Sequence, residues 1–225
     1  MNEHEIMKVL SSVGAVITDN HIVYTSGRHG SVYVNKDAVY PHTKKTSALC
    51  KITAQNFADD SVDVVIAPAA GGIIISQWTA YHLSEITGRD VLGIYAEKEI
   101  MVIPDPEGKN RKCYFETGGF VIKRGYDKLV KGKNVLVTED VLTTGGSAKK
   151  VIEAVRALGG NVVGLGVLCN RGNIKPSDVA NPPRLFSLIN VKLDSWDEGD
   201  CPLCGEDVPI NTDVGKGREY LSKKM

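Results

Sequence analysis

The chain has 225 residues, of which 42% are hydrophobic, so it is long enough to bury a substantial core. Basic and acidic residues number 27 each, which leaves no global charge to attract nucleic acid or an anionic membrane. No apolar run reaches the roughly 18 residues that span a bilayer, and the N-terminal segment MNEHEIMKVL is charged rather than signal-like. Five cysteines with one close pair do not suggest a disulfide framework. We therefore expect a single cytoplasmic domain over residues 1–225, with neither nucleic acid nor membrane as partner.

Apolar periodicity and turn residues predict strands that alternate with helices. In chain order we expect a helix over 3–14, a hairpin-like segment over 16–34 with its turn at 26–30, and a helix over 43–57. A strand over 62–66, a tight loop over 68–72, a helix over 73–86 with its apolar side at 74, 78, 81 and 82, and a strand over 91–95 follow. After a mobile polar loop over 97–118 we expect a strand over 135–138, a helix over 147–158 and a strand over 162–169. This alternation indicates an α/β fold with a largely parallel sheet, whose ligands bind beyond the carboxyl ends of the strands.

The stretch VLVTEDVLTTGGS, from Val135 to Ser147, carries the clearest chemistry. A buried strand is expected to end in two acids, and a loop of hydroxyls and glycines then leads into a helix. The glycines let the backbone approach a ligand, and the free amides of the helix start suit a phosphate. The carboxylates repel phosphate but suit the neutral diol of a ribose. The pattern thus predicts acids at the diol (Glu139, Asp140) and a phosphate loop (Thr143, Thr144, Gly145, Gly146, Ser147). The simpler alternative is a solvated acidic pair before an ordinary helix cap.

This pattern resembles the phosphoribosyl pyrophosphate (PRPP) signature of type I phosphoribosyltransferases, and the form EDVLTTGGS is most similar to orotate phosphoribosyltransferases. The resemblance implies a mostly parallel central sheet flanked by helices. It also implies a core over 60–170, a small hood from residues 1–40 with the C-terminal part, a mobile loop over 97–118 and a Cys-x-x-Cys tail over 195–225. The implied reaction transfers phosphoribosyl from PRPP to a nucleobase, in this case orotate, and releases orotidine 5′-monophosphate and pyrophosphate. Mg²⁺ bound with the pyrophosphate and a homodimer are implied as well. A different base (purine or nicotinate) or a non-catalytic PRPP-sensing regulator are the alternatives.

The resemblance also assigns residues outside this stretch. The segment 67–73 is similar to the family's pyrophosphate loop, formed here by Ala69, Ala70, Gly71 and Gly72. Lys98 matches a basic residue that holds pyrophosphate, and it joins Glu139 and Asp140 as an expected catalytic residue. The expected base contacts are Thr25, Ser26, Tyr33 and Arg171, although packing in the fold is an alternative role for Tyr33. The family usually has lysines where Thr25 and Gly71 stand, and this departure leaves the accepted base open.

The C-terminal tail contains the C-x-x-C pair Cys201 and Cys204, which is half of a zinc site. Two more ligands would have to come from elsewhere, for example from Cys169 or a histidine. The five histidines are scattered without metal-ligand spacing, and only His29, in the base-side turn, is a candidate for a functional role. The sequence therefore favours a purely structural tail over a zinc site.

Overall fold

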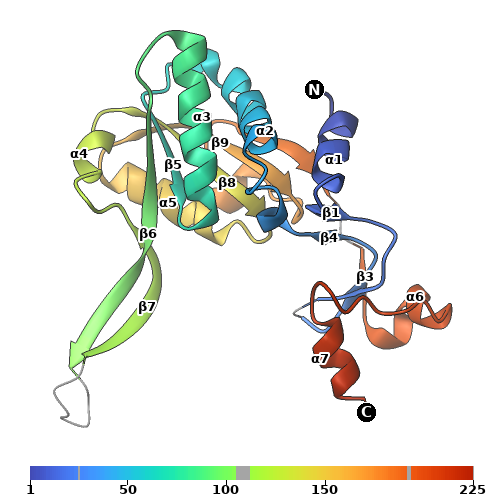
Figure 1. Ribbon diagram of the computed structural model, residues 1–225. Helices are drawn as coiled ribbons and strands as arrows, with labels where there is room; N and C mark the ends of the chain where they lie inside the picture. The colour runs from blue at the N-terminus through green and yellow to red at the C-terminus, as the bar shows by residue number, and fades with distance from the viewer. Residues whose placement is uncertain (25, 105–111, 192–193, 225) are drawn as a thin grey trace. The chain divides into compact units, whose positions relative to one another are not determined.

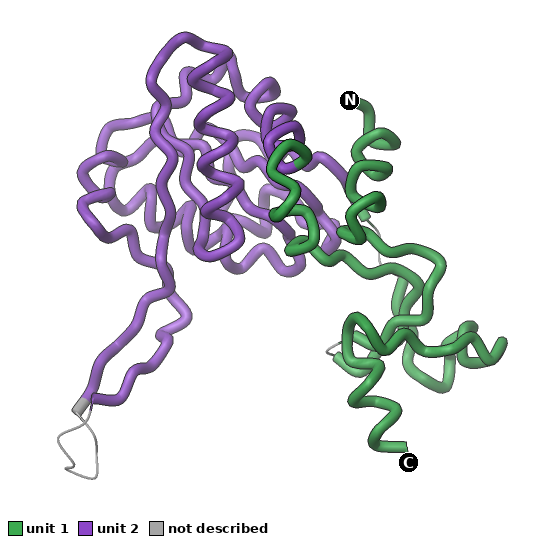
Figure 2. The backbone as a smooth tube through the Cα atoms, in the orientation of Figure 1, with its two compact units in different colours: residues 1–45, 191–225 green, residues 46–190 purple. Residues whose placement is uncertain are grey.

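The structure is a computed structural model that describes residues 1–24, 26–104, 112–191 and 194–224. It divides into two compact units, which are described separately below: unit 1 comprises residues 1–45 and 191–225, and unit 2 comprises residues 46–190 (Figure 2). None of the helices in these described ranges combines the length and the apolar character that crossing a membrane requires.

The α-helices and strands are labelled in Figure 1. The helices are α1 (Glu3–Ser11), α2 (Thr43–Asn56), α3 (Gly71–Thr87), α4 (Asp127–Val130), α5 (Gly146–Ala157), α6 (Pro202–Gly205) and α7 (Gly217–Ser222). The strands are β1 (Val16–Ile17), β2 (Ile22–Val23), β3 (His29–Gly30), β4 (Tyr33–Val34), β5 (Val64–Pro68), β6 (Leu92–Pro104), β7 (Lys112–Val121), β8 (Asn134–Leu142), β9 (Asn161–Asn170), β10 (Leu185–Asn190) and β11 (Ser195–Trp196). Short 3-10 helices lie at Lys36–Ala38, Ala58–Asp60, Pro176–Val179 and Glu198–Asp200.

Unit 2 is built on a six-stranded sheet with the order β10-β9-β8-β5-β6-β7. The first five strands of this order pair in parallel, and only β7 runs antiparallel, against β6. The predicted α/β class with a mostly parallel sheet is therefore confirmed. Strands β7 and β10 were not predicted from the sequence.

The two faces of this sheet are covered by different helices, as the alternation of buried residues shows. Val64 and Ile66 of β5 belong to a core cluster with Val151, Ile152 and Val155 of α5. Val65, between them, belongs to another cluster with residues of α3 and with Ala54 and Phe57, in and after α2. Side chains at successive strand positions face opposite ways, so α5 covers one face and α2 and α3 cover the other.

The apolar side predicted for α3 is the wrong one. Its buried residues are Gly72, Ile75, Ser76, Thr79, Ala80 and Leu83. Ile74 and Tyr81, expected inside, have exposed fractions of 36% and 52%. The buried side combines Ile75 and Leu83 with small and hydroxyl residues, so its position is not marked by apolar residues alone.

Residues 97–118 were expected to form an irregular loop, but most of them are strand. β6 continues past its pairing with β5 and forms an antiparallel ribbon with β7, from Glu97 opposite Val121 to Pro104 opposite Lys112 (Figure 1). The ribbon exposes large apolar side chains, namely Ile100, Met101, Val102, Tyr114 and Phe115. The interpretation of this segment as polar overlooked the apolar and aromatic runs at 100–103 and 113–115, which favour strands. The predicted mobility of the segment stays a prediction.

Unit 1 joins the N-terminal segment to the C-terminal one. β3 pairs antiparallel with β2 on one side and with β11 on the other, and β1 pairs antiparallel with β4. The turn was predicted at 26–30, but His29 and Gly30 are already in β3, so the connection between β2 and β3 ends before His29. Gly30 is required where it stands, since a Cβ there would lie 2.3 Å from the Tyr24 hydroxyl.

Candidate functional site

The acidic pair lies inside a strand. The sequence predicted a strand that stops at residue 138, with the two acids at its end. β8 continues to Leu142, and Glu139 and Asp140 are buried, with exposed fractions of 6% and 5%. Each carboxylate bends forward along the chain: the Asp140 amide donates to Glu139 Oε1 at 3.1 Å, and the Val141 amide donates to Asp140 Oδ1 at 2.6 Å. Two acids are thus held near the carboxyl edge of the sheet.

The loop after β8 has the form expected of a phosphate loop. Thr143, Thr144 and Ser147 are exposed, whereas Gly145 is buried, so hydroxyls and helix-start amides surround a close-packed glycine. Gly145 has a φ of +75°, and a Cβ at this position would lie 2.5 Å from Val179 Cγ1. Only glycine meets both conditions without strain, and α5 begins at the next residue. The Gly146 amide makes only a long bond, at 3.4 Å, to the Thr144 hydroxyl, and the amides of a helix start can bind an anion.

A neighbouring strand end supports this loop from behind. The backbone amides of Arg171 and Gly172, after β9, both donate to the Leu142 carbonyl, at 3.0 and 3.1 Å. The Arg171 Nε donates to the Thr143 hydroxyl at 2.8 Å. A Cβ on Gly172 would lie only 1.9 Å from the Thr143 carbonyl oxygen, so the two segments are in direct backbone contact. Apart from Gly172 itself, nothing in the sequence predicted this contact.

The segment predicted to hold pyrophosphate leaves the sheet beside the acidic pair. β5 pairs in parallel with β8, with Val64 opposite Val135, so their carboxyl ends reach the same edge. Ala69 and Ala70 connect β5 to α3, and the peptide between them is cis. Gly72 lies close to β5, where a Cβ would meet Ala67 Cβ at 2.7 Å. The acids, the phosphate loop and this second loop therefore share one edge of the sheet.

Lys98 lies on β6, two residues beyond Ala96, which is opposite Pro68 of β5. Its Nζ forms an exposed ion pair with Glu116 Oε2 of β7 at 2.8 Å. The preceding Glu97, where the family usually has arginine, pairs with Arg124 at 2.7 Å and raises the pKa of that guanidinium. The negative charge of Glu97, opposite in sign to the arginine usual in the family, is therefore paired with Arg124.

The expected base contacts are divided between the two units. Thr25 lies outside the described residues. In unit 1, Ser26 accepts a long bond from the Arg28 amide at 3.4 Å, and the half-buried Tyr33 pairs with Ile17 in the β1–β4 ladder. In unit 2, Arg171 contacts the phosphate loop. A base site that all four residues share stays a prediction.

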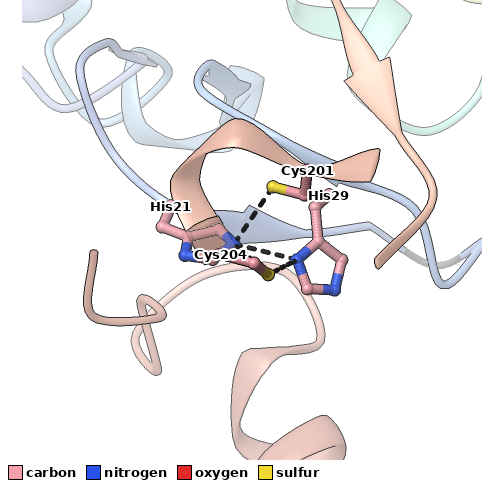
Figure 3. Close-up of side chains that lie close together, drawn as sticks. All are labelled: His21, His29, Cys201 and Cys204. Carbon is pink, nitrogen blue, oxygen red and sulfur yellow. Dashed lines mark hydrogen bonds between the residues drawn. The ribbon is translucent and has the colours of Figure 1, made fainter. Parts of the chain in front are cut away.

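The cysteine tail has histidine neighbours that the sequence did not reveal. The side chains of His21, His29, Cys201 and Cys204 converge in unit 1, with their potential ligand atoms all within 4.8 Å of one another (Figure 3). The interpretation of the histidines as scattered was wrong for this pair, because the antiparallel pairing of β2 with β3 brings them together. Cys169, once a possible ligand, is buried in β9 of unit 2, and burial raises the pKa of its thiol to about 12.

Comparisons with known proteins agree with this geometry. The family model described as "Phosphoribosyl transferase domain" matches residues 37–200. Orotate phosphoribosyltransferase of Pelotomaculum thermopropionicum is 36% identical over 93% of this chain and 95% of its own length, and that of Desulforamulus reducens is 35% identical with the same coverage. The crystal structure of orotate phosphoribosyltransferase from Mycobacterium tuberculosis H37Rv superposes with a TM-score of 0.59 at 19% identity, and covers 84% of this chain and 95% of that one. The predicted type I phosphoribosyltransferase fold is confirmed, and the chain belongs to the phosphoribosyltransferases, within the orotate phosphoribosyltransferase family.

Proposed function

We propose that this protein transfers the phosphoribosyl group of PRPP to a ring nitrogen of orotate and releases orotidine 5′-monophosphate and pyrophosphate. The observation that carries the proposal is the shared sheet edge, where two buried acids adjoin a phosphate loop and a second loop suited to pyrophosphate. The two curated relatives, which match nearly the whole chain, are orotate enzymes, so another base or a non-catalytic regulator is not favoured.

In the proposed complex, each part of this edge binds one part of PRPP. The hydroxyls of Thr143, Thr144 and Ser147 and the first amides of α5 bind the 5′-phosphate. Glu139 and Asp140 accept hydrogen bonds from the ribose hydroxyls. The amides of Ala70, Gly71 and Gly72 face the pyrophosphate, since the Ala69 amide already donates to the Ala96 carbonyl at 2.8 Å.

The reaction breaks the bond from ribose C1 to a pyrophosphate oxygen and forms a bond from C1 to the base nitrogen. Positive charge develops on the sugar ring in between, and the two carboxylates stabilise it electrostatically while they hold the ring in place. The buried position of both acids strengthens this effect, because water screens them little.

Mg²⁺ is proposed to enter with PRPP and to neutralise charge on the pyrophosphate leaving group. The family resemblance implies a cation that is held mainly by substrate oxygens and water, so we assign it no dedicated protein ligand.

Lys98 is proposed to help to hold the pyrophosphate. Its present partner, Glu116, is an exposed carboxylate, and exposed ion pairs of this kind contribute only about 0–1 kcal/mol. The lysine can therefore exchange that carboxylate for a more highly charged pyrophosphate. The ribbon that carries Lys98 is proposed to close over the bound ligand, which would exclude water from the reactive sugar.

The test is an assay with orotate, PRPP and Mg²⁺ that follows the absorbance of orotate. We expect orotate to be consumed in proportion to PRPP, and we expect a metal chelator to stop the reaction. Parallel assays with adenine, hypoxanthine and nicotinate are expected to show at most slight turnover. Consumption of one of these bases without consumption of orotate would contradict the proposed substrate, and consumption of none would contradict the proposed enzyme.

A homodimer is proposed to cover the outer side of α3. Ile74, Tyr81 and Ile86 are 36%, 52% and 42% exposed, and Trp78 lies against Tyr81 with ring centroids 5.8 Å apart. A second copy of the chain is the proposed occupant, as the family resemblance implies. Cytoplasmic location likewise stays a prediction.

We expect Tyr81→Arg to convert the dimer to a monomer in analytical ultracentrifugation, because the charge cannot be buried in an apolar interface. Glu153→Arg, on the exposed side of α5, is the matched control and is expected to leave the mass unchanged. A wild-type monomer at micromolar concentration would contradict this proposal.

A further inference from the structure

Four metal-ligating side chains meet in unit 1, whereas the residues assigned to PRPP all belong to unit 2. His21 and His29 come from the β2–β3 hairpin, and Cys201 and Cys204 come from the short turn of α6 (Figure 3). Their separation along the chain is large, yet Cys204 Sγ lies 3.3 Å from His29 Nδ1 and 3.7 Å from His21 Nε2. Three of the four residues are buried, with exposed fractions of 1%, 0% and 4% for His21, His29 and Cys201.

The distances fit a tetrahedral ion. With Zn–N near 2.0 Å and Zn–S near 2.3 Å, tetrahedral ligands should lie about 3.3 Å (N to N), about 3.5 Å (N to S) and about 3.8 Å (S to S) apart. Three of the four nitrogen–sulfur distances are 3.3, 3.7 and 3.7 Å, and all the potential ligand atoms lie within 4.8 Å of one another. The His21 Nε2 and His29 Nδ1 atoms are 2.8 Å apart, so the two rings would separate slightly around a bound ion.

The hydrogen bonds of His21 favour a metal over a chance cluster. Its Nδ1 is 2.7 Å from the Val208 carbonyl oxygen, which can only accept, so Nδ1 carries the proton and Nε2 presents its lone pair to the cluster. Metal-bound histidines typically donate their other ring nitrogen to a carbonyl or carboxylate in this way. His29 is held by the edge of Tyr220 of α7, with ring centroids 5.0 Å apart.

We propose that His21, His29, Cys201 and Cys204 form a structural Zn²⁺ site that ties the β2–β3 turn to the C-terminal tail. Two sulfurs and two imidazole nitrogens are the donor set of closed zinc sites, and four protein ligands leave no position for substrate, so the ion has no catalytic role. Binding releases the protons of both thiols. His21 directly precedes β2, and His29 is the first residue of β3. Arg28, next to His29, donates to the Ser195 carbonyl and pairs with Asp197 of the C-terminal segment, so zinc and Arg28 fix the same junction.

The direct test is the metal content of the purified protein, measured by mass spectrometry after growth with zinc. We expect about one zinc per chain in the wild type, as a closed site of four ligands requires. Cys204→Ser is expected to lose most of it. Cys113→Ser, which changes a cysteine of β7 outside the cluster, is the matched control and is expected to keep it. Zinc that persists in Cys204→Ser would overturn the assignment.

A second measurement does not depend on any variant. Wild-type protein is stripped with a strong chelator and titrated with Co²⁺. A tetrahedral site with two thiolates should give visible d–d bands and a near-ultraviolet thiolate-to-cobalt band, and the spectrum should saturate at about one Co²⁺ per chain. Restoring Zn²⁺ should raise Tm by at least about 5 °C, because the ion binds the folded unit only. A protein that contains no zinc, gives no cobalt spectrum or carries a Cys201–Cys204 disulfide would overturn the proposal, whatever its enzymatic activity.

Discussion

The double variant Glu139→Gln/Asp140→Asn is expected to lower kcat by at least about 10²-fold, since removal of one well-placed electrostatic group in an active site already costs about 10²–10³-fold. The amides keep the shape of the carboxylates and an oxygen that accepts the bonds from the Asp140 and Val141 amides. They lose the negative charge that the cationic sugar requires. Steady-state kinetics with saturating orotate and PRPP measure the effect.

Stability separates this loss of charge from a loss of fold. Both side chains are buried and β8 is central in the sheet, so a misfolded variant would show a large fall in Tm. We expect Tm to stay within a few degrees of the wild type. Glu153→Gln, an exposed change on α5, serves as the control with unchanged kcat. Turnover by the double variant within about threefold of the wild type would remove the acidic pair from the mechanism.

Gly172→Ala is expected to reduce kcat/KM for PRPP by about 10²-fold, because a displacement of about 1 Å in a positioning element is enough for such a loss. The new Cβ would lie 1.9 Å from the Thr143 carbonyl oxygen, and that atom belongs to backbone. The phosphate loop must therefore move away from β9, and Thr143 would lose its bond from Arg171. Measurement of KM for PRPP at fixed orotate is the test.

The matched control for this variant is Gly199→Ala, because nothing lies within 4 Å of a Cβ at that position. It is expected to behave as wild type in kinetics and in Tm. If Gly172→Ala also kept the wild-type KM for PRPP, the loop would not depend on the β9 contact, and its role as a phosphate site would lose its structural basis.

The sheet and the strand-to-helix turn after β8 were predictable because their signals are local. Buried strands such as Val64–Ile66 are continuous apolar runs, and the TTGGS segment states its own turn chemistry. The end of β8 was not predictable, since Glu139 and Asp140 are poor strand formers that the ladder with β9 nevertheless keeps extended. Pairing of β6 with β7 likewise forms the ribbon in a segment that was interpreted as a polar loop.

Contacts between segments that are distant in the sequence could not be predicted, for a different reason. The support of Thr143 by Gly172 depends on the parallel pairing of β8 with β9, and the meeting of His21 with Cys204 depends on the fold of unit 1. Periodicity reports which face of an element is buried but not which residues meet there. On α3 even the face was wrong, because Ile75 and Leu83 share the buried side with the small or hydroxyl residues Ser76, Thr79 and Ala80.

The pairing of β3 with β11 has a consequence for the order of events on the ribosome. Unit 1 draws on residues 1–45 and 191–225, whereas unit 2 is one continuous segment between them. The N-terminal hairpin is synthesised before unit 2, whereas its β11 partner and the cysteines Cys201 and Cys204 are synthesised after unit 2. During translation, therefore, the six-stranded sheet of unit 2 can fold before β11 is available to pair with β3.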